Sequence, residues 1–216
     1  MSQIIEQRLL EIEKKVKGLL KTKGMCQELS DLWNEERILK RNLSLEKGEE
    51  TAVPIEWKYL WDTGADCPHV LADGYRVFLV YYLPLVGTNW DGTYVNVRNT
   101  GSNKEDLIAL VEFIGVVNFT FGGPNEEVLH GHPLYEHGLE RFSAHEIINS
   151  KWIAEQEKIN AVHSCHNPER WKVLKHYALT FHDEMFECIA EEYNVDVVKG
   201  RFKDVVFEAT KRLFDK

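Results

Sequence analysis

The chain has 216 residues, of which 44% are hydrophobic and 28% are charged, and its formal net charge is −9. This length and composition predict a soluble globular protein that buries a core in one domain, or in one domain with an appendage. The acidic balance and the lack of a dense Lys/Arg block argue against nucleic acid as a partner, and no apolar run approaches the roughly 18 residues of a membrane span.

The cysteine usage and the first residues both bear on the compartment. The cysteines are widely scattered and form no C-x-x-C pair, which predicts no disulfide framework and favours a reducing cytoplasm; they are Cys26, Cys67, Cys165 and Cys188. The opening residues, MSQIIEQRLLEIEKK, are charged from the sixth position onward, so we do not expect a secretory signal there.

Residues 3–47 are predicted to be helical, with a break near Gly24. Apolar residues in the first half follow the 4-3-4-3 spacing of a coiled-coil seam, namely Ile5, Leu9, Ile12, Val16 and Leu19. The spacing lasts only about two heptads, which fits either a homo-oligomer or a helical hairpin docked on its own domain. A polar linker over residues 46–54 follows, so we predict an N-terminal helical segment over 1–50 and an α+β domain over 51–216.

The periodicity after residue 54 becomes that of strands, and the expected strands and helices are as follows. Strands are expected over 55–61, 76–83, 94–98, 107–121, 142–148 and 176–181, and in part of 185–198, with helices over 150–162 and 203–214. Alternate residues of the run 107–121, including Phe113 and Val117, should share one face. Strands in succession with few helices between them predict a mostly antiparallel sheet or open barrel, covered by helices.

The segment 122–150 is predicted to be a loop that carries the polar site. It begins with Gly-Gly-Pro and holds His130, His132, His137 and His145. On an extended segment, His130 and His132 would point the same way and could bind one divalent metal such as zinc. A catalytic site also needs a third ligand. Asp183 completes the candidate metal set, and the other candidates are His137, His182 and Glu187. Two alternatives remain: histidines that hydrogen-bond within the loop, and a metal-free acid or base.

A second group of polar residues follows in the segment HYALTFHDEMFEC. His176, Thr180 and His182 would share one strand face, which either lines a pocket beside the His-rich loop or faces water. The candidate ligand-binding residues are therefore His130, His132, His137, Thr180 and His182. The expected ligand is a small polar molecule or a protein partner.

Two further stretches carry chemistry of their own. The residues Asp62 to Asp66 read DTGAD, which resembles the catalytic loop of retroviral-type aspartic proteases, and Phe113-Ile114-Gly115 resembles a hydrophobic-hydrophobic-Gly motif of that family. The resemblance implies that Asp62 pairs with its copy across a dimer, whereas the competing interpretation is a tight turn. Cys165 lies between His163 and His166, where an imidazolium would lower the pKa of the thiol.

The blocks GGPNEE, HGHPL and FHDEMFECIA resemble those of a family of small bacterial proteins with no assigned activity, over roughly residues 56–198. That resemblance implies no mechanism. The leading hypothesis is a ligand- or partner-binding sensor protein with a His-rich polar site, which self-associates through its N-terminal helices. The alternatives are a metal-dependent hydrolase that uses the His130/His132 pair, and an aspartic protease at Asp62.

Overall fold

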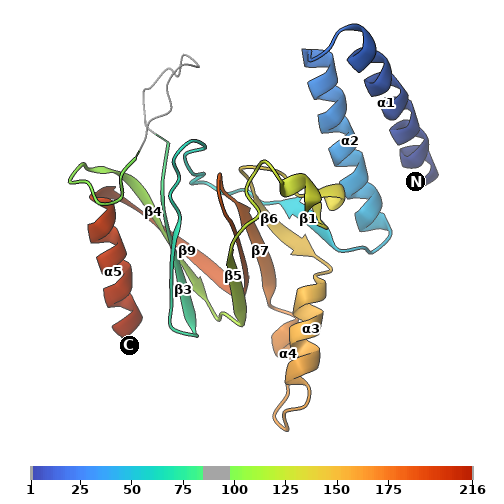
Figure 1. Cartoon of the computed structure of the whole chain (residues 1–216). Helices are drawn as coiled ribbons and strands as arrows, with labels where there is room; N and C mark the ends of the chain where they lie inside the picture. The colour runs from blue at the N-terminus through green and yellow to red at the C-terminus, as the bar shows by residue number, and fades with distance from the viewer. Residues whose placement is uncertain (1, 85–97, 216) are drawn as a thin grey trace.

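The computed structural model describes residues 2–84 and 98–215, and Figure 1 shows how its elements are arranged. The chain begins with two helices, α1 (Ser2–Thr22) and α2 (Gln27–Glu46), which pack against each other as a hairpin. The seam is apolar: Ile5 and Ile12 of α1 and Leu29 and Leu32 of α2 are buried. The hairpin interpretation of the 4-3-4-3 spacing therefore describes this chain, and the hairpin stands beside the sheets in Figure 1.

The remaining elements form two antiparallel sheets. The five-stranded sheet has the order β1 (Thr51–Pro54), β6 (Ala144–Ile148), β7 (Lys175–Thr180), β8 (Met185–Ala190) and β5 (Asn118–Gly122). The four-stranded sheet has the order β2 (His69–Ala72), β3 (Arg76–Tyr82), β4 (Asp106–Ile114) and β9 (Glu192–Gly200). The described residues thus confirm an α+β fold with antiparallel sheets, and they form two open sheets without a closed barrel.

The main core lies between the two sheets. Alternate residues of each strand point into it, including Leu79 and Phe113 from the four-stranded sheet and Leu179 and Phe186 from the five-stranded sheet. Helix α5 (Phe202–Phe214) covers the outer face of the four-stranded sheet, where Phe202 packs in a second core. Two short helices, α3 (Lys151–Asn160) and α4 (Pro168–Trp171), lie against the outer face of the five-stranded sheet.

The run 107–121, predicted as one strand, is two strands in different sheets. β4 pairs with β9 as far as Ile114 opposite Glu192, and β5 pairs with β8 from Asn118 opposite Ile189. Three residues therefore stand opposite two at the corner, which is a β-bulge. Gly115 occupies this bulge with φ +67°. The extra residue changes which side chains face the core, so Val117 packs with the outer cluster of Trp171 and Ile189, and its predicted alignment with Phe113 is wrong.

The prediction of a strand over residues 55–61 is also wrong. The strand β1 lies just before it, in the segment expected to be a linker, and residues 55–61 form no strand. Their apolar side chains fill the core instead: Trp57 donates a hydrogen bond from Nε1 to the Tyr81 hydroxyl at 2.8 Å, and Trp61 packs 4.4 Å from the ring of Phe181. The strand predicted over 94–98 falls almost wholly on residues outside those described.

Candidate functional site

The predicted His-rich loop covers the outer face of the five-stranded sheet. It contains two short 3-10 helices, η1 (Leu129–Gly131) and η2 (Tyr135–His137). Leu129, Leu134 and Leu139 pack on the sheet. Thr180 is buried in the same layer, where its Oγ1 donates to Glu140 O at 2.7 Å and accepts from Ser143 N at 3.1 Å. Thr180 therefore holds the loop on the sheet, and its hydroxyl is already used for that purpose.

His130 and His132 do not lie on an extended segment. His130 is within η1 and His132 directly follows it, so the extended segment from which a shared direction of their imidazoles was inferred does not form. The exposed ring of His130 lies with Nδ1 3.1 Å from Glu127 O. His132 Nδ1 accepts a hydrogen bond from Leu134 N at 3.2 Å, and burial lowers the pKa of this imidazole. Both rings thus make local backbone contacts, which is the alternative left open above.

His137 contacts the N-terminal hairpin. Its Nδ1 lies 2.8 Å from the Ser44 hydroxyl of α2 and 3.5 Å from Glu49 Oε2. Ser44 is buried by this contact between the helix and the loop. The position of His137 is therefore explained by attachment of the hairpin, and no ligand is needed to account for it.

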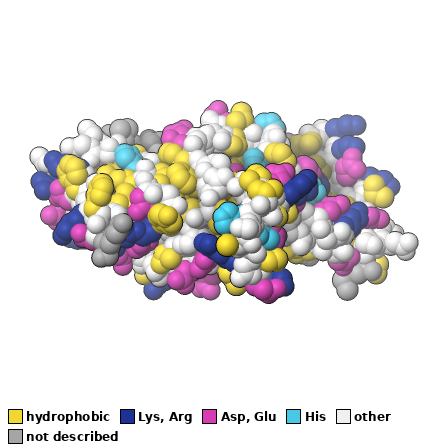
Figure 2. All heavy atoms as spheres, turned by 90° about the horizontal axis from the view of Figure 1, so that it is seen from below, with side chains coloured by type: hydrophobic (Ala, Val, Ile, Leu, Met, Phe, Trp, Pro, Cys, Tyr) yellow, Lys and Arg dark blue, Asp and Glu magenta, His cyan; other side chains and the backbone are white. Residues whose placement is uncertain are grey.

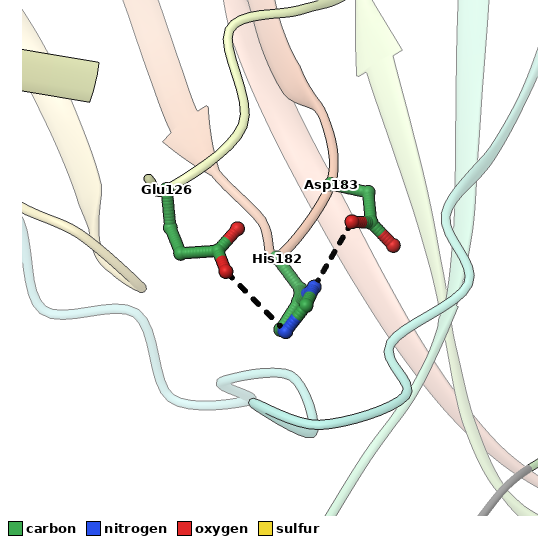
Figure 3. Close-up of side chains that lie close together, drawn as sticks. All are labelled: Glu126, His182 and Asp183. Atoms are coloured by element: carbon green, nitrogen blue, oxygen red, sulfur yellow. Dashed lines mark ion pairs between the residues drawn. The ribbon is translucent and has the colours of Figure 1, made fainter. Parts of the chain in front are cut away.

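His182, in contrast, lies at the centre of a group of carboxylates that we call the His182 cluster: Asp66, Glu126, His182, Asp183 and Glu184. Glu126 Oε1 is 3.4 Å from His182 Nε2, and Asp183 Oδ1 is 3.1 Å from Nδ1. Figure 3 shows one carboxylate beside each of the two ring nitrogens of His182. Glu126 comes from the loop after β5, whereas His182 and Asp183 belong to the turn between β7 and β8. Segments distant in sequence thus meet here.

Backbone hydrogen bonds fix this meeting point. Asp66 is buried, and its Oδ2 accepts from His182 N at 2.8 Å while its Oδ1 accepts from Cys67 N at 2.9 Å. Glu126 N donates to His182 O at 3.1 Å. The β7–β8 turn is therefore tied to the DTGAD loop on one side and to the GGPNEE loop on the other.

Burial and like charges change the protonation equilibria in the cluster. Burial raises the pKa of Asp66, and burial together with the charges of Asp183 and Asp66 raises that of Glu184. Burial alone would lower the pKa of His182, but the hydrogen bond to Asp183 and the charges of Glu126, Asp183 and Asp66 outweigh it and raise that pKa. The cluster therefore favours a positive charge at its centre, whether a proton or a metal ion supplies it.

Glu126, His182 and Asp183 are also the one group of three or more potential ligands, within the part of the chain that the structure describes, whose ligand atoms lie within 4.8 Å of one another. The set His130, His132 and Asp183 forms no such group. Of the predicted site residues, His182 and Asp183 come together, while His130, His132, His137 and Thr180 lie elsewhere on the loop and sheet.

Asp62 has a different environment from that of a protease aspartate. Its Oδ1 accepts from Gly64 N and Ala65 N at 2.9 and 3.1 Å, as in a tight turn, and its Oδ2 lies 2.8 Å from Arg98 Nη2. The Arg98 side chain is buried. Both carboxylate oxygens of Asp62 are thus occupied within the chain, whereas the protease aspartate pairs with its copy across a dimer. This geometry supports the tight-turn interpretation of DTGAD.

Sequence reasoning missed Glu126 and Asp66 as members of a site. Glu126 lies in the GGPNEE block, whose resemblance implies no site, and Asp66 lies in DTGAD, which indicates a protease motif or a turn. The signal was the presence of carboxylates in three separate polar blocks, and the sequence contains no indication that the three would meet. Cys165 is exposed, and the imidazole of His163 accepts from the Cys165 backbone N at 3.1 Å.

No family model, curated protein or solved structure matches the chain. Over the described residues, no helix is both long enough and apolar enough to cross a bilayer.

Acidic, basic and apolar side chains are interspersed over the face drawn in Figure 2, where histidine side chains also reach the surface.

Proposed function

We propose that this protein is a binding or sensor protein whose ligand site is the His182 cluster, and that the ligand is a divalent cation. The observation that carries the proposal is the 3.4 Å separation of Glu126 Oε1 and His182 Nε2. Two ligand atoms bound to one zinc ion at about 2.0–2.2 Å in a tetrahedral site lie roughly 3.3 Å apart. The two atoms are thus spaced as ligands of one ion.

Asp183 has a supporting role in this proposal. It contacts Nδ1, the ring nitrogen opposite the one that faces Glu126. Metal-binding histidines commonly donate their second ring N–H to a carboxylate, which fixes the tautomer and increases the basicity of the ligand nitrogen. Glu126 and His182 would therefore bind the ion, and Asp183 would orient the imidazole.

The number of ligands favours binding over a purely structural role. Structural zinc sites are closed by four protein ligands, whereas a site with two protein ligands completes its coordination with water and exchanges its ion. The loop that supplies Glu126 also supplies His137 and Glu140, both of which contact α2. One segment thus contacts both the proposed ion site and the hairpin, which supports a sensor function.

The experiment is zinc or manganese binding by the full chain, measured by calorimetry with Glu126→Gln, His182→Ala and Asp183→Asn variants. We expect one ion per chain, loss of binding for the first two variants, and affinity reduced about 10- to 100-fold for Asp183→Asn. The affinity should fall as pH decreases through the raised pKa of His182, because the proton competes with the ion for the imidazole.

Glu127→Gln is the matched control, because Glu127 is the exposed neighbour of Glu126 and lies outside the cluster. Equal weakening by Glu126→Gln and Glu127→Gln would show a nonspecific charge effect and reject the site. The hydrolase alternative requires a metal that is lost in the double variant His130→Ala/His132→Ala. We expect that variant to keep its ion.

We propose, in addition, that the hairpin mediates self-association. Its seam is filled within the chain, so a second copy would contact the outer surface, where Ile4, Leu10 and Met25 are 74%, 58% and 77% exposed. Sedimentation of the full chain should then show an oligomer that Leu10→Asp weakens. Val162→Asp, a change of an even more exposed apolar residue on the α3–α4 side, is the control. A monomer at high concentration would contradict the proposal.

A further inference from the structure

A second polar arrangement lies at the start of β7, whereas the His182 cluster lies beyond its end. Ser150 Oγ is 2.9 Å from Nδ1 of His176, and Nε2 of the same ring is 3.1 Å from Glu187 Oε1. These three side chains come from the start of α3, from β7 and from β8. They form a continuous chain of hydrogen bonds that the His182 cluster does not share.

The capping of α3 determines which atom carries the proton in each of these hydrogen bonds. Ser150 is the N-cap residue, and its Oγ accepts from Ile153 N at 3.1 Å. The single hydroxyl proton is therefore free to point at His176 Nδ1, which accepts it, so the proton of the neutral ring lies on Nε2 and points at Glu187. A hydroxyl, a base and a carboxylate in this order are the parts of an activated serine nucleophile.

The surroundings of His176 hold the ring in this orientation. The His176 side chain is only 3% exposed, and the edge of Trp152 packs against it with ring centroids 5.0 Å apart. Glu187 remains partly exposed at 21%. A ring that cannot rotate keeps its base nitrogen on the serine hydroxyl, which is what proton transfer at that atom requires.

The backbone around Ser150 also resembles that of a nucleophile site. The chain passes from β6 through Asn149, at φ +55°, into the first turn of α3. The first N–H groups of a helix have no acceptor within the helix and stabilise negative charge. Here Lys151 N donates to Glu50 Oε1 at 2.7 Å, so a carboxylate oxygen of the chain itself is bound at this turn.

A groove of about 390 Å³ lies over this arrangement, and both Ser150 and His176 line it. Its apolar wall includes Ile147, Ile153 and Leu174, while Lys175 and Glu146 form an ion pair at 3.4 Å on its rim. A small group with a short apolar chain fits such a wall better than a charged or bulky one.

We propose that Ser150, His176 and Glu187 form an acyl-transfer site that hydrolyses small esters with a short apolar acyl group. Ser150 Oγ bonds to the ester carbonyl carbon as its proton passes to His176 Nδ1. The ester C–O bond then breaks, and the same proton passes to the departing alkoxide. Water then loses a proton to Nδ1 as its oxygen bonds to the acyl carbon. The bond between that carbon and Ser150 Oγ breaks, the carboxylic acid leaves, and the proton returns from Nδ1 to Ser150 Oγ. Glu187 is a positioning residue that stabilises the transient imidazolium.

The test is labelling of the full chain with a fluorophosphonate, which bonds to an activated serine oxygen with loss of fluoride, followed by peptide mass mapping. We expect one adduct, at Ser150, and none in Ser150→Ala or Ser150→Asn. Asparagine keeps the N-cap hydrogen bond to Ile153, so Ser150→Asn separates loss of the nucleophile from loss of the helix cap. Ser164→Ala, at an exposed serine, is the matched control and should label like the wild type.

Glu187→Gln tests the relay itself. We expect the labelling rate to fall about 10²- to 10⁴-fold, while the midpoint of urea unfolding stays at the wild-type value, because glutamine keeps a carbonyl oxygen that accepts the Nε2–H hydrogen bond. A purely structural role for Glu187 would lower the unfolding midpoint together with the labelling rate. The proposal is wrong if the folded wild type gives no Ser150 adduct, or if the labelling rate is unchanged in Glu187→Gln.

Discussion

His145 is buried within β6, and its environment keeps the ring neutral. It is 0% exposed, and Nε2 accepts a hydrogen bond from Glu140 N at 3.1 Å. Nδ1 is buried and has no hydrogen-bond partner among the described residues. Burial lowers the pKa of His145 to about 4. The folded chain therefore resists a proton that the unfolded chain, with an ordinary histidine pKa of about 6.5, accepts readily.

The sign of the resulting pH dependence is fixed by this difference. Between about pH 6.5 and 4 the unfolded state binds more protons at this position than the folded state does. The contribution of neutral His145 to the free energy of unfolding is therefore fully present above pH 6.5 and is lost as pH falls. Urea unfolding should give a free energy about 2 kcal/mol lower at pH 5.0 than at pH 7.5 from this residue. His145→Gln removes the titrating group, and an unchanged difference between the two pH values would contradict the assignment.

At the scale of elements, the corner between β4 and β5 depends on a single residue. Gly115 has φ +67°, and a Cβ atom there would lie 2.6 Å from Glu191 Cδ. The Glu191 side chain can move aside, so the cost of Gly115→Ala comes mainly from the backbone. We expect a loss of about 1–2 kcal/mol in the free energy of unfolding, measured in urea.

Gly18 supplies the matched comparison for that substitution. It lies within α1, and no atom lies within 4 Å of a Cβ built there. Because alanine is about 1 kcal/mol better than glycine in a helix interior, Gly18→Ala should stabilise the chain or leave it unchanged. Equal destabilisation by both substitutions would show that the bulge has no special requirement for glycine.

At the scale of the whole molecule, Arg41 joins the hairpin to the sheets. Its Nε donates to Ala52 O and its Nη2 to Gly138 O, both at 3.1 Å, and it forms an ion pair with Glu140. Arg41→Met keeps the apolar stem and removes these bonds, which we expect to lower stability by about 2–3 kcal/mol. Hydrogen exchange should then become faster in α2.

Arg8→Met is the control for that change, because Arg8 pairs with Glu11 and Glu35 inside the hairpin and does not reach the sheets. Arg8→Met should therefore raise the exchange rate of α2 less than Arg41→Met does. If α2 exchanged at the wild-type rate in Arg41→Met, the hairpin would be held to the sheets by its other contacts, and the assignment to Arg41 would be wrong.

The same three scales separate what the sequence could predict from what it could not. The helical hairpin, the strand at 76–83 and the helix predicted over 150–162 follow from local periodicity. The corner at Gly115 was missed because a bulge preserves apolar composition while it shifts the alternation, and residues 55–61 were misassigned because Trp57 and Trp61 fill the core from irregular backbone. His182 and Asp183 were singled out, but their contact with Glu126 depends on tertiary packing that no local pattern encodes.

The β4–β5 and β8–β9 segments together form a bent two-stranded ribbon, and this ribbon affects how the molecule unfolds. β4 continues into β5, and β8 continues into β9, so the same pair of chain segments belongs to both sheets. Neither sheet can lose its pairing there without loosening the other, so heating should produce one calorimetric transition for the two sheets together. The ribbon also joins segments from distant parts of the chain, and closing so large a loop before any contact forms predicts refolding over milliseconds to seconds.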